Sequence, residues 1–464
     1  MLNSLYAQAR QLFHRLFEND LIRRVVKNSG YLFSATVFTA AIGMVQSILA
    51  ARLLGVAAFG VLGVITVFAT VLNKLVSFRM SELVVKYVGQ FTETGDQPRA
   101  AATFKSAAIV ELGASVLAFT LIWLLAPLGA TYFAKDPASA NWFVLYGLVI
   151  LANLIAESST GLLQIFNRFR QFSMINVIAS LVTLSIIIIV YFLHGGFLGV
   201  LIAYISGKAF SAIGLSVLAL LEASHRWGKQ WWRTPVKLLR PQGRQMINFA
   251  INTNISASLS LITKDSEVLW VALLRNPVEA GYYKVALSLA NIVQLPISPL
   301  PQATYPELSR EVARQNWNNV RYVLRQGSLL AGSYTLAVTI FLLLLGRPLL
   351  SFVYTPEFLP AYPALLIVLA GYLVANTFYW NRVALLAIGR ADIPTKVNLA
   401  LAILKIMGII LLVPIYGYVA SAALLAGSYI LGVSYSVLRF RYEITRRERT
   451  PSAPPISEAN SNRK

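Results

Sequence analysis

The fold is decided by an apolar stretch in the first half of the chain. From Ser173 to Leu221 it reads SMINVIASLVTLSIIIIVYFLHGGFLGVLIAYISGKAFSAIGLSVLALL. It holds two runs of roughly 20 mostly apolar residues, each long enough to cross a bilayer as a helix. His194-Gly195-Gly196 separates the two runs. The stretch therefore predicts a hairpin of two membrane-spanning helices.

The whole chain shares this composition. Of its 464 residues, 57% are hydrophobic and 13% are charged, and the mean hydropathy is +0.64. An ordinary soluble domain carries roughly 25% charged residues, and disordered chains are polar and highly charged. Both classes are therefore excluded. The chain has no cysteine and three histidines, which excludes disulfides and thiolate sites and argues against a metal site.

Length and hydropathy together predict an all-α integral membrane protein with twelve transmembrane helices. The expected spans are residues 30–53, 57–78, 105–127, 141–165, 173–193, 197–221, 246–274, 281–303, 327–350, 362–388, 395–414 and 417–438. No connection between them is long enough for a soluble domain.

The distribution of basic residues predicts the topology. If the N-terminus is cytoplasmic, 30 of the 40 lysines and arginines lie in cytoplasmic connections and tails, and four lie outside. Because basic loops stay cytoplasmic, both termini are predicted on the inner side of a bacterial or archaeal cytoplasmic membrane. The net charge of +21 thus indicates contact with the anionic lipids of the inner leaflet, and no nucleic-acid partner is expected.

The segments outside the spans suggest a domain plan. Residues 1–25 predict a cytoplasmic amphipathic helix on the membrane surface, with a frayed basic tail as the alternative. Residues 26–221 and 246–440 form two lobes, and a basic cytoplasmic linker over 222–245 joins them. Trp227, Trp231 and Trp232 in this linker are interpreted as interfacial anchors. Residues 441–464 are expected to be a basic, disordered cytoplasmic tail.

The two halves of the sequence repeat at a shift of about 221 residues. Asn167-Arg168 aligns with Gly389-Arg390, and Gly196 aligns with Gly417. An even number of spans in each half inserts both halves with the same orientation. The repeat is therefore parallel, with an axis along the membrane normal, and such transporters place the substrate site between the halves. Two pseudo-symmetric six-helix lobes around a central cavity are expected.

Apart from Arg52, Lys105, Arg347 and Lys396 near the span ends, ten charged residues fall inside the predicted spans, where each costs roughly 2.5–3.5 kcal/mol at the centre of a helix. They are Lys74, Lys208, Lys264, Lys284, Arg382, Lys405, Glu111, Glu157, Asp265 and Glu267. The deeper ones, Lys208, Lys264, Lys405, Glu157 and Asp265, are expected to face a hydrated cavity. Those nearer the span ends, Lys74, Lys284, Arg382 and Glu111, could instead reach the interface by snorkelling.

The seventh span carries a polar stripe with helical spacing. Its members are Asn248, Asn252, Ser256, Ser260, Lys264 and Glu267. Residues three or four apart share one helix face, so the stripe should line water or be buried in protein. Alternatively, Lys264 and Glu267 simply neutralise each other. Pro296, Pro299 and Pro301 break the eighth span, which suggests a gate or hinge, although a purely structural kink is the alternative.

Several short motifs resemble one known family. Arg52-Leu53-Leu54-Gly55 with Ala58-Phe59-Gly60, and Asp265 followed by Ala280-Gly281-Tyr282-Tyr283, resemble the matching loops of the polysaccharide-biosynthesis flippases. This family belongs to the multidrug/oligosaccharidyl-lipid/polysaccharide exporter superfamily. The resemblance covers about residues 25–440. Arg275 and Phe78-Arg79 stand where glycines are usual.

The resemblance implies a flippase rather than an enzyme. Its substrate would be a polyprenyl-diphosphate-linked oligosaccharide, moved from the cytoplasmic to the outer leaflet by alternating access, with a polysaccharide polymerase as a further partner. The sequence has no phosphate-binding loop of the ATPase type. Cationic groups would bind the diphosphate, and the candidates are Lys208, Lys264, Arg382 and Lys405. Asp265, Glu157 and Glu267 are candidates for coupling to Na⁺ or H⁺, and no other cofactor is expected.

Three other functions fit less well. A multidrug or small-cation exporter of the same superfamily would favour an acidic cavity, whereas cations outnumber acids six to four inside the spans. A membrane polymerase or ligase needs an outside loop with catalytic groups, and the largest one offers only Lys135 and Asp136. A scaffold would have little use for charged spans.

Overall fold

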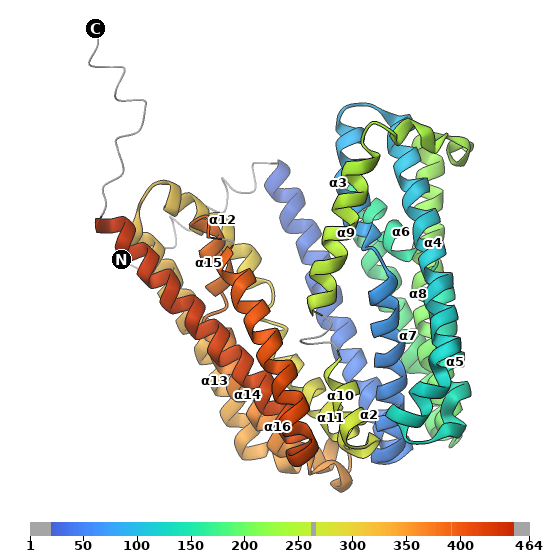
Figure 1. Cartoon of the computed structure of the whole chain (residues 1–464), viewed down its shortest axis with the longest axis vertical. Coiled ribbons are helices and arrows are strands. Elements are labelled where there is room, and N and C mark those ends of the chain that lie inside the picture. The colour runs from blue at the N-terminus through green and yellow to red at the C-terminus, as the bar shows by residue number, and fades with distance from the viewer. Residues whose placement is uncertain (1–19, 261–265, 391, 450–464) are drawn as a thin grey trace. The chain divides into compact units, whose positions relative to one another are not determined.

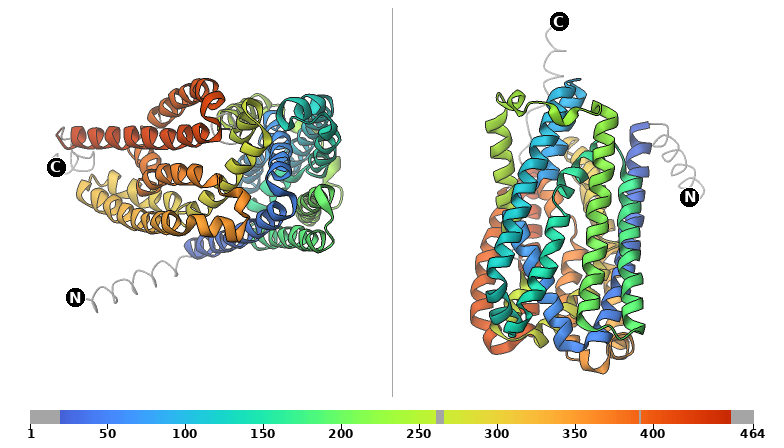
Figure 2. Two further views of the ribbon diagram at one scale, coloured as in Figure 1. Left: turned by 90° about the horizontal axis from the view of Figure 1, so that it is seen from below. Right: turned by 90° about the vertical axis from the view of Figure 1, so that its right-hand side faces the viewer.

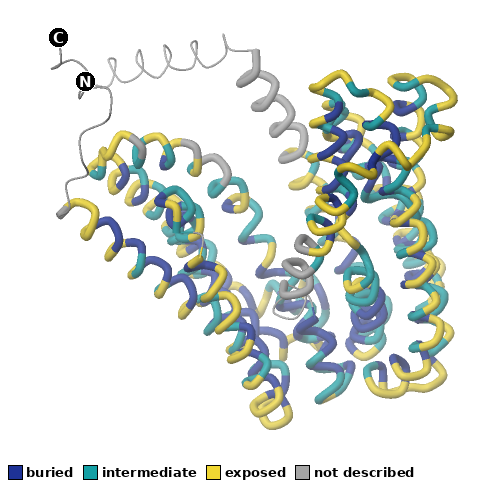
Figure 3. The backbone as a smooth tube through the Cα atoms, turned by 45° about the horizontal axis from the view of Figure 1, so that its top comes forward, coloured by how far each residue is buried: buried dark blue, intermediate teal, exposed yellow. Residues whose placement is uncertain are grey.

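The computed structural model describes residues 20–260, 266–390 and 392–449, and in these ranges all regular structure is helical. The chain divides into two compact units, one ending at Gly281 and the other beginning at Tyr282. Within each unit, long helices run side by side (Figures 1 and 2). Buried and exposed residues alternate along them (Figure 3). The predicted all-α membrane fold is confirmed.

The first unit is built mainly from four long helices and their shorter companions. Its elements are α2 (Asp20–Val76), α3 (Met80–Glu93), α4 (Gln97–Leu128), η1 (Gly129–Ala134), η2 (Pro137–Ser139), α5 (Ala140–Ala152), α6 (Ala156–Ile165), α7 (Phe169–Phe192), α8 (Gly196–Trp227), η3 (Trp231–Arg233), η4 (Val236–Leu239), α9 (Gly243–Ser260) and α10 (Glu267–Leu274). Helix α7 packs against α2 and α8, while α3 packs against α4 and α6.

The second unit repeats this plan with fewer separate elements. Helix α11 (Pro277–Gln294) crosses the boundary between the units. It is followed by α12 (Leu300–Ala313), α13 (Trp317–Val353), η6 (Pro356–Phe358), α14 (Ala361–Thr377), α15 (Asn381–Ala387) and α16 (Asp392–Arg449). Helix α14 packs against α13 and α16, and α15 packs against α12 and α16.

Eight helices in the described ranges are long and apolar enough to cross a membrane. Two of them each hold two predicted spans. Ser34–Val76 contains the first and second, and Asp392–Glu448 contains the eleventh and twelfth. The predicted seventh and eighth spans are not among the eight, and residues 261–265 of the seventh lie outside the described residues. The count of twelve stays a prediction.

Glycines reverse the chain inside the two longest helices. Gly55 in α2 has φ 71° and Gly417 in α16 has φ 63°. Only glycine adopts such positive φ values without steric cost, because it has no Cβ. Each glycine therefore separates two spans that the hydrogen-bonding pattern otherwise joins into one helix.

The internal repeat is visible in the backbone. Asn167 and Gly389 both have positive φ, at 55° and 77°, and so do Gly196 and Gly417, at 64° and 63°. Each pair is separated by 221 or 222 positions, the shift seen in the sequence. The helices α4 and α13 also begin alike. Asp96 caps α4 by accepting a hydrogen bond from the amide of Arg99, and Asn316 caps α13 by accepting one from the amide of Asn319.

Two of the motifs that resemble the flippase family pack against each other. A Cβ on Gly60 of α2 would overlap the carbonyl oxygen of Pro277, and a Cβ on Gly281 would come within 2.7 Å of the carbonyl oxygen of Val56. Any larger residue would push the start of α11 away from α2. The glycines in Phe59-Gly60 and Ala280-Gly281 thus permit a close helix crossing.

The predicted proline break is present. Helix α11 ends at Gln294 and α12 begins at Leu300, and the intervening residues include Pro296 and Pro299, while Pro301 lies in the first turn of α12. The first unit breaks at the corresponding place without proline, between Val76 and Met80, where Arg79 has φ 47°. This left-handed conformation explains why glycine is usual there in the family that the sequence resembles.

The chain differs from the predicted plan in the linker and in the C-terminal tail. The expected disordered tail began at residue 441, yet α16 continues to Arg449, because Glu443 and Ile444 are buried against the rest of the second unit. In the linker, Trp227 and Trp231 pack against the buried ring of Phe104 rather than standing free at the interface. The predicted surface helix falls mostly on residues 1–19 and the end of the tail on 450–464, both outside the described residues.

Candidate functional site

A polar cavity of about 430 Å³ lies in the first unit between α2, α7 and α8. Ten of the side chains that line it end in a hydroxyl, an amide or an amine. These polar residues include Thr39, Gln46, Asn176, Tyr204, Lys208 and Ser211. Their presence inside apolar spans fits a water-lined site, because unpaired polar groups are costly in lipid.

Hydrogen bonds hold the amide groups of this cavity in place. Gln46 Nε2 donates to the carbonyl oxygen of Ser180 at 2.7 Å, which ties α2 to α7. Ser211 Oγ donates to Asn176 Oδ1 at 2.8 Å, which ties α8 to α7. The close packing of α7 and α8 depends on Gly207, since a Cβ there would overlap Thr183 Oγ1. The cavity wall is thus a preorganised set of dipoles.

The charge in this cavity comes from Lys208. Its side chain is exposed to the cavity space, and it is the one basic residue among the lining residues, which include no carboxylate. No ion pair links Lys208 to a residue in the described ranges. A lone ammonium surrounded by neutral dipoles attracts an anion. The structure therefore places this predicted site residue in a cavity able to receive a negatively charged group.

Glu111, a charged residue near the end of a predicted span, is buried and caps a helix. Glu111 of α4 is 6% exposed, so its carboxylate does not snorkel. It accepts hydrogen bonds from the amides of Glu157 and Ser158 at 2.7 and 2.8 Å, and from Ser158 Oγ at 2.6 Å. A carboxylate at a helix N-terminus satisfies free amides and the helix dipole. Glu111 therefore fixes the start of α6.

Glu157 lies in the same junction, beside the break between α2 and α3. Its carboxyl group lies beside the Ser77 side chain and the Met80 backbone amide. Its Oε2 atom is buried and accepts no hydrogen bond from the described part of the chain. Asn254 of α9 donates to the Ser77 carbonyl oxygen at the same break. The predicted ion-coupling candidate thus has one oxygen free to bind a proton or a cation.

The remaining predicted site residues are dispersed. Lys405 of α16 is 4% exposed and Glu267 at the start of α10 is 3% exposed. Arg382 is exposed on α15, and Asn248 is exposed on α9. Lys264 and Asp265 lie outside the described residues. Asn252, Ser256 and Ser260 lie on α9, but their side chains are outside the described part.

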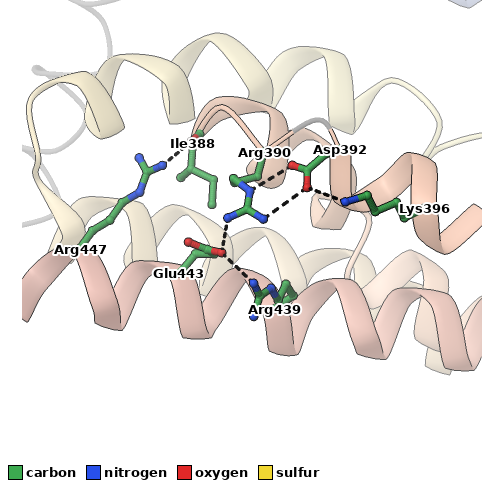
Figure 4. A network of polar contacts seen from close by, with 7 residues as sticks. All are labelled: Ile388, Arg390, Asp392, Lys396, Arg439, Glu443 and Arg447. Atoms are coloured by element: carbon green, nitrogen blue, oxygen red, sulfur yellow. Dashed lines mark hydrogen bonds and ion pairs between the residues drawn. The ribbon is translucent and has the colours of Figure 1, made fainter.

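One arrangement of ion pairs recurs in both units among the described residues, and the residue patterns alone predicted neither copy. Glu222 pairs with Arg168 and Arg226 at 2.8 and 3.1 Å. Glu443 pairs with Arg390 and Arg439 at 2.6 and 3.3 Å (Figure 4). The alignment of Arg168 with Arg390 had been visible in the sequence. The matching of the two glutamates, 221 positions apart, was the signal that could have revealed the pairs.

The second network extends around the start of α16. Arg390 also pairs with Asp392 at 3.0 Å, and Arg447 Nη2 donates to the Ile388 carbonyl oxygen at 2.6 Å (Figure 4). The hydrogen bond with Asp392 is the main cause of a raised pKa at Arg390. In the first unit the network joins the residue before α7 to the last turns of α8, and in the second it joins the residues before α16 to the last turns of that same helix. Their role is structural.

Comparison with known proteins identifies the family. Residues 25–312 match the model of the polysaccharide biosynthesis protein family. The inner membrane protein YghQ of Escherichia coli (strain K12) is 23% identical over 349 residues, which are 75% of this chain and 97% of that protein.

Solved structures show the same fold. The lipid II flippase MurJ in an inward closed conformation has a TM-score of 0.69 at 16% identity, covering 88% of this chain and 87% of its own. A multidrug resistance MATE family transporter of the MOP superfamily, in an inward-facing conformation, has a TM-score of 0.66 at 13% identity. The match covers 89% of this chain and 96% of that transporter. A MOP superfamily transporter from Pyrococcus furiosus, described as having a binding pocket of reverse polarity, has a TM-score of 0.61 at 13% identity. The match covers 94% of this chain and 98% of that transporter. This multi-pass chain therefore belongs to the polysaccharide biosynthesis protein family and has the fold of the MOP-superfamily membrane transporters.

Proposed function

We propose that this protein flips a polyprenyl-diphosphate-linked oligosaccharide from the cytoplasmic to the outer leaflet of a cytoplasmic membrane by alternating access. The oligosaccharide would be the repeat unit of a cell-surface polysaccharide. Membership of the polysaccharide biosynthesis protein family supports the substrate class. The fold shared with a structure described as a lipid II flippase supports the mode of transport. Both termini would be cytoplasmic, as the basic loops predict.

The observation that carries the proposal is the position of Lys208. Its ammonium group lies in a polar cavity without carboxylates among the lining residues. A diphosphate entering from the bilayer would find there a cation and several neutral hydrogen-bond donors, while its prenyl chain stays in lipid. Because a hydrogen bond between a cation and a phosphate oxygen is charge-assisted, it is stronger than a neutral one, and Lys208 would be the main attractive group for the diphosphate.

Other predicted residues have supporting roles in the proposal. Lys264, Arg382 and Lys405 are further partners for the diphosphate. Asp265, Glu157 and Glu267 are candidates for coupling transport to a gradient of Na⁺ or H⁺, and the free Oε2 atom makes Glu157 the strongest of them. The break at Pro296, Pro299 and Pro301 would be the place where the eighth span bends during transport. A polysaccharide polymerase would take up the product.

The test is Lys208→Gln in a strain that lacks its own copy of the gene. The variant keeps a flexible, hydrogen-bonding side chain and removes the charge. It should allow the lipid-linked oligosaccharide to accumulate in the inner leaflet, as measured by mass spectrometry of extracted lipids and by accessibility to an added glycosidase. Lys396→Gln is the matched control, because Lys396 is a solvent-exposed lysine on α16. Wild-type export by Lys208→Gln would refute the role of this cavity.

Ion coupling needs a separate test. Glu157→Gln should abolish the dependence of flipping on the Na⁺ or H⁺ gradient in proteoliposomes, while Glu307→Gln, on the exposed surface of α12, should leave it intact. Unchanged gradient dependence in the Glu157 variant would remove this residue from the coupling mechanism.

The alternative function is export of drugs or small cations, as in other members of the superfamily. A cation would be repelled by Lys208, so Lys208→Gln should then improve export rather than impair it. Drug susceptibility of the same strains separates the two functions: increased drug resistance with unchanged lipid-linked intermediates would favour the exporter.

A further inference from the structure

The second unit has a groove of about 530 Å³ at the end where α13 begins and α16 ends. Its basic side chains are Arg321 and Arg325 on α13 and Arg441 on α16. Trp380, Phe440 and Leu329 are among the apolar residues that form the rest of its wall. We refer to it as the arginine groove. The predicted topology places this end of the unit at the cytoplasmic face of the membrane.

The arginine groove carries positive charge that the described chain does not neutralise. Arg321 is paired with both carboxylate oxygens of Glu448. Arg325 and Arg441 are exposed, and neither forms an ion pair with a residue in the described ranges. Arg321 and Arg325 are four positions apart, so they lie on one face of α13, where like charges repel. Two guanidinium groups thus remain available for an anion.

The neutral polar groups of the groove are already engaged. Thr377 Oγ1 donates to the carbonyl oxygen of Leu373 at 2.6 Å, and Thr445 Oγ1 donates to that of Arg441 at 3.0 Å. Ser328 Oγ accepts a hydrogen bond from Trp380 Nε1 at 2.7 Å. A sugar needs several free donors and acceptors, whereas a phosphate needs only cations and donors. The groove therefore suits a ligand whose polar part is an anion and whose remainder is apolar.

The internal repeat shows that the corresponding surface of the first unit is covered. Lys105 corresponds to Arg325, and its Nζ donates to the Thr234 carbonyl oxygen at 3.2 Å. The ring of Trp231 lies 5.3 Å from that of Phe104, and η3 and η4 pack against α4. The chain that follows α8 thus seals this face with aromatic rings. In the second unit the described chain ends with α16 at Arg449, and the arginine groove lies at the repeated position.

We propose that the arginine groove binds an anionic glycerophospholipid of the cytoplasmic leaflet. The phosphate would lie between Arg325 and Arg441, and an acyl chain would lie along the exposed Leu329, above the buried rings of Trp380 and Phe440. The bound lipid would cover in the second unit the face that η3 and η4 cover in the first. Charge complementarity commits the site to an anionic lipid, because a zwitterionic headgroup would bring a cation towards two arginines.

The experiment compares two double variants of the full-length protein that remove the same charge. Arg325→Gln with Arg441→Gln alters the groove, and Arg240→Gln with Arg244→Gln alters exposed arginines of the first unit. Each protein is purified in mild detergent and titrated with phosphatidylglycerol, with phosphatidylcholine as the zwitterionic probe. Native mass spectrometry counts the lipids that remain bound, and thermal unfolding measures the stabilisation they confer.

Wild type and the Arg240/Arg244 control should each retain one phosphatidylglycerol that the groove variant loses, with an affinity change of at least tenfold. Equal retention by all three proteins would overturn the proposal. So would equal binding of phosphatidylcholine, because the arginines would then not select the lipid. Without lipid, the groove variant should have the same melting temperature as the Arg240/Arg244 control. Equal melting temperatures would show that the groove variant is correctly folded.

Competition decides between two sources of the same phosphate chemistry. Undecaprenyl phosphate is added at concentrations equal to those of the phosphatidylglycerol. The proposal expects phosphatidylglycerol to remain bound. Displacement at equal concentration would mean that the arginine groove takes a polyprenyl carrier, which would overturn the assignment to a glycerophospholipid. Flipping activity is measured separately, so a negative result here leaves the proposed function untouched.

Discussion

Arg390 Nη1 lies 2.6 Å from Glu443 Oε1, and this ion pair repeats a pair in the other unit. In that unit, Arg168 Nη2 lies 2.8 Å from Glu222 Oε2. The two arginines are 222 positions apart and the two glutamates 221. The first pair joins the residue before α7 to the last turns of α8, and the second joins the residue two positions before α16 to the last turns of α16. A repeat that began as a shift in the sequence is therefore also a repeat of specific interactions.

Loss of the ion pair between Arg390 and Glu443 should destabilise the second unit. Glu443→Gln removes the charge that two arginines share, while Glu443 itself is 5% exposed in its side chain. A buried carboxylate with two partners contributes more than a surface ion pair. We expect the melting temperature of the purified protein to fall by several degrees. Glu307→Gln, in the exposed pair with Arg310, is the control and should melt like wild type.

Removal of the Glu111 carboxylate should loosen the start of α6. Glu111→Gln keeps the size of the side chain but turns an amide NH₂ group towards donors that now bond to the carboxylate. Hydrogen bonds to charged groups contribute roughly 1.5–3 kcal/mol each, so we expect a loss of about that size in thermal unfolding. Faster hydrogen exchange should appear at Glu157 and Ser158 and not in α5. Unchanged exchange there would contradict the capping role.

Close packing of α7 and α8 should be intolerant of even one methyl group. In Gly207→Ala the new Cβ would overlap Thr183 Oγ1 and lie 2.9 Å from the Ala179 carbonyl oxygen. Overpacking of this kind costs about 1–3 kcal/mol. Gly113→Ala is the matched control, because nothing lies within 4 Å of its Cβ position. Adding Thr183→Ala should recover part of the stability, whereas no recovery would place the strain elsewhere.

The linker tryptophans should differ in importance. Trp231 packs against the buried ring of Phe104, whereas Trp232 is 54% exposed. Trp231→Ala should expose Phe104 and lower the melting temperature by several degrees, since aromatic contacts and buried area are lost together. Trp232→Ala should change it little. If Trp232 mattered more, membrane anchoring rather than packing would be the main role of the linker.

Local chemistry made much of the architecture predictable. The apolar spans, the turns at Gly196 and Gly417, and the repeat are properties of short stretches, because glycine and hydropathy act on the nearest turn of the chain. The break at Pro296 and Pro299 was predictable for the same reason. The break at Arg79 was not, since an arginine in the left-handed conformation is held there by its surroundings and leaves no local signal.

The candidate site was only partly predictable. Hydropathy showed that Lys208, Glu111 and Glu157 were in unusual places, but not what surrounds each one. Glu111 proved to be a helix cap, Lys208 lies in a polar cavity, and Arg382 is exposed. These differences depend on which way each helix is rotated, and packing between helices decides that rotation.

The sequence by itself determined that this is a helical membrane protein built from a repeat, because those properties follow from composition and from the period of apolar residues. Only the tertiary structure decided which charges have partners and which lie in a cavity. Ion pairs such as Arg390 with Glu443 join residues more than 50 positions apart. No local pattern encodes such a contact, since it exists only after the helices have packed.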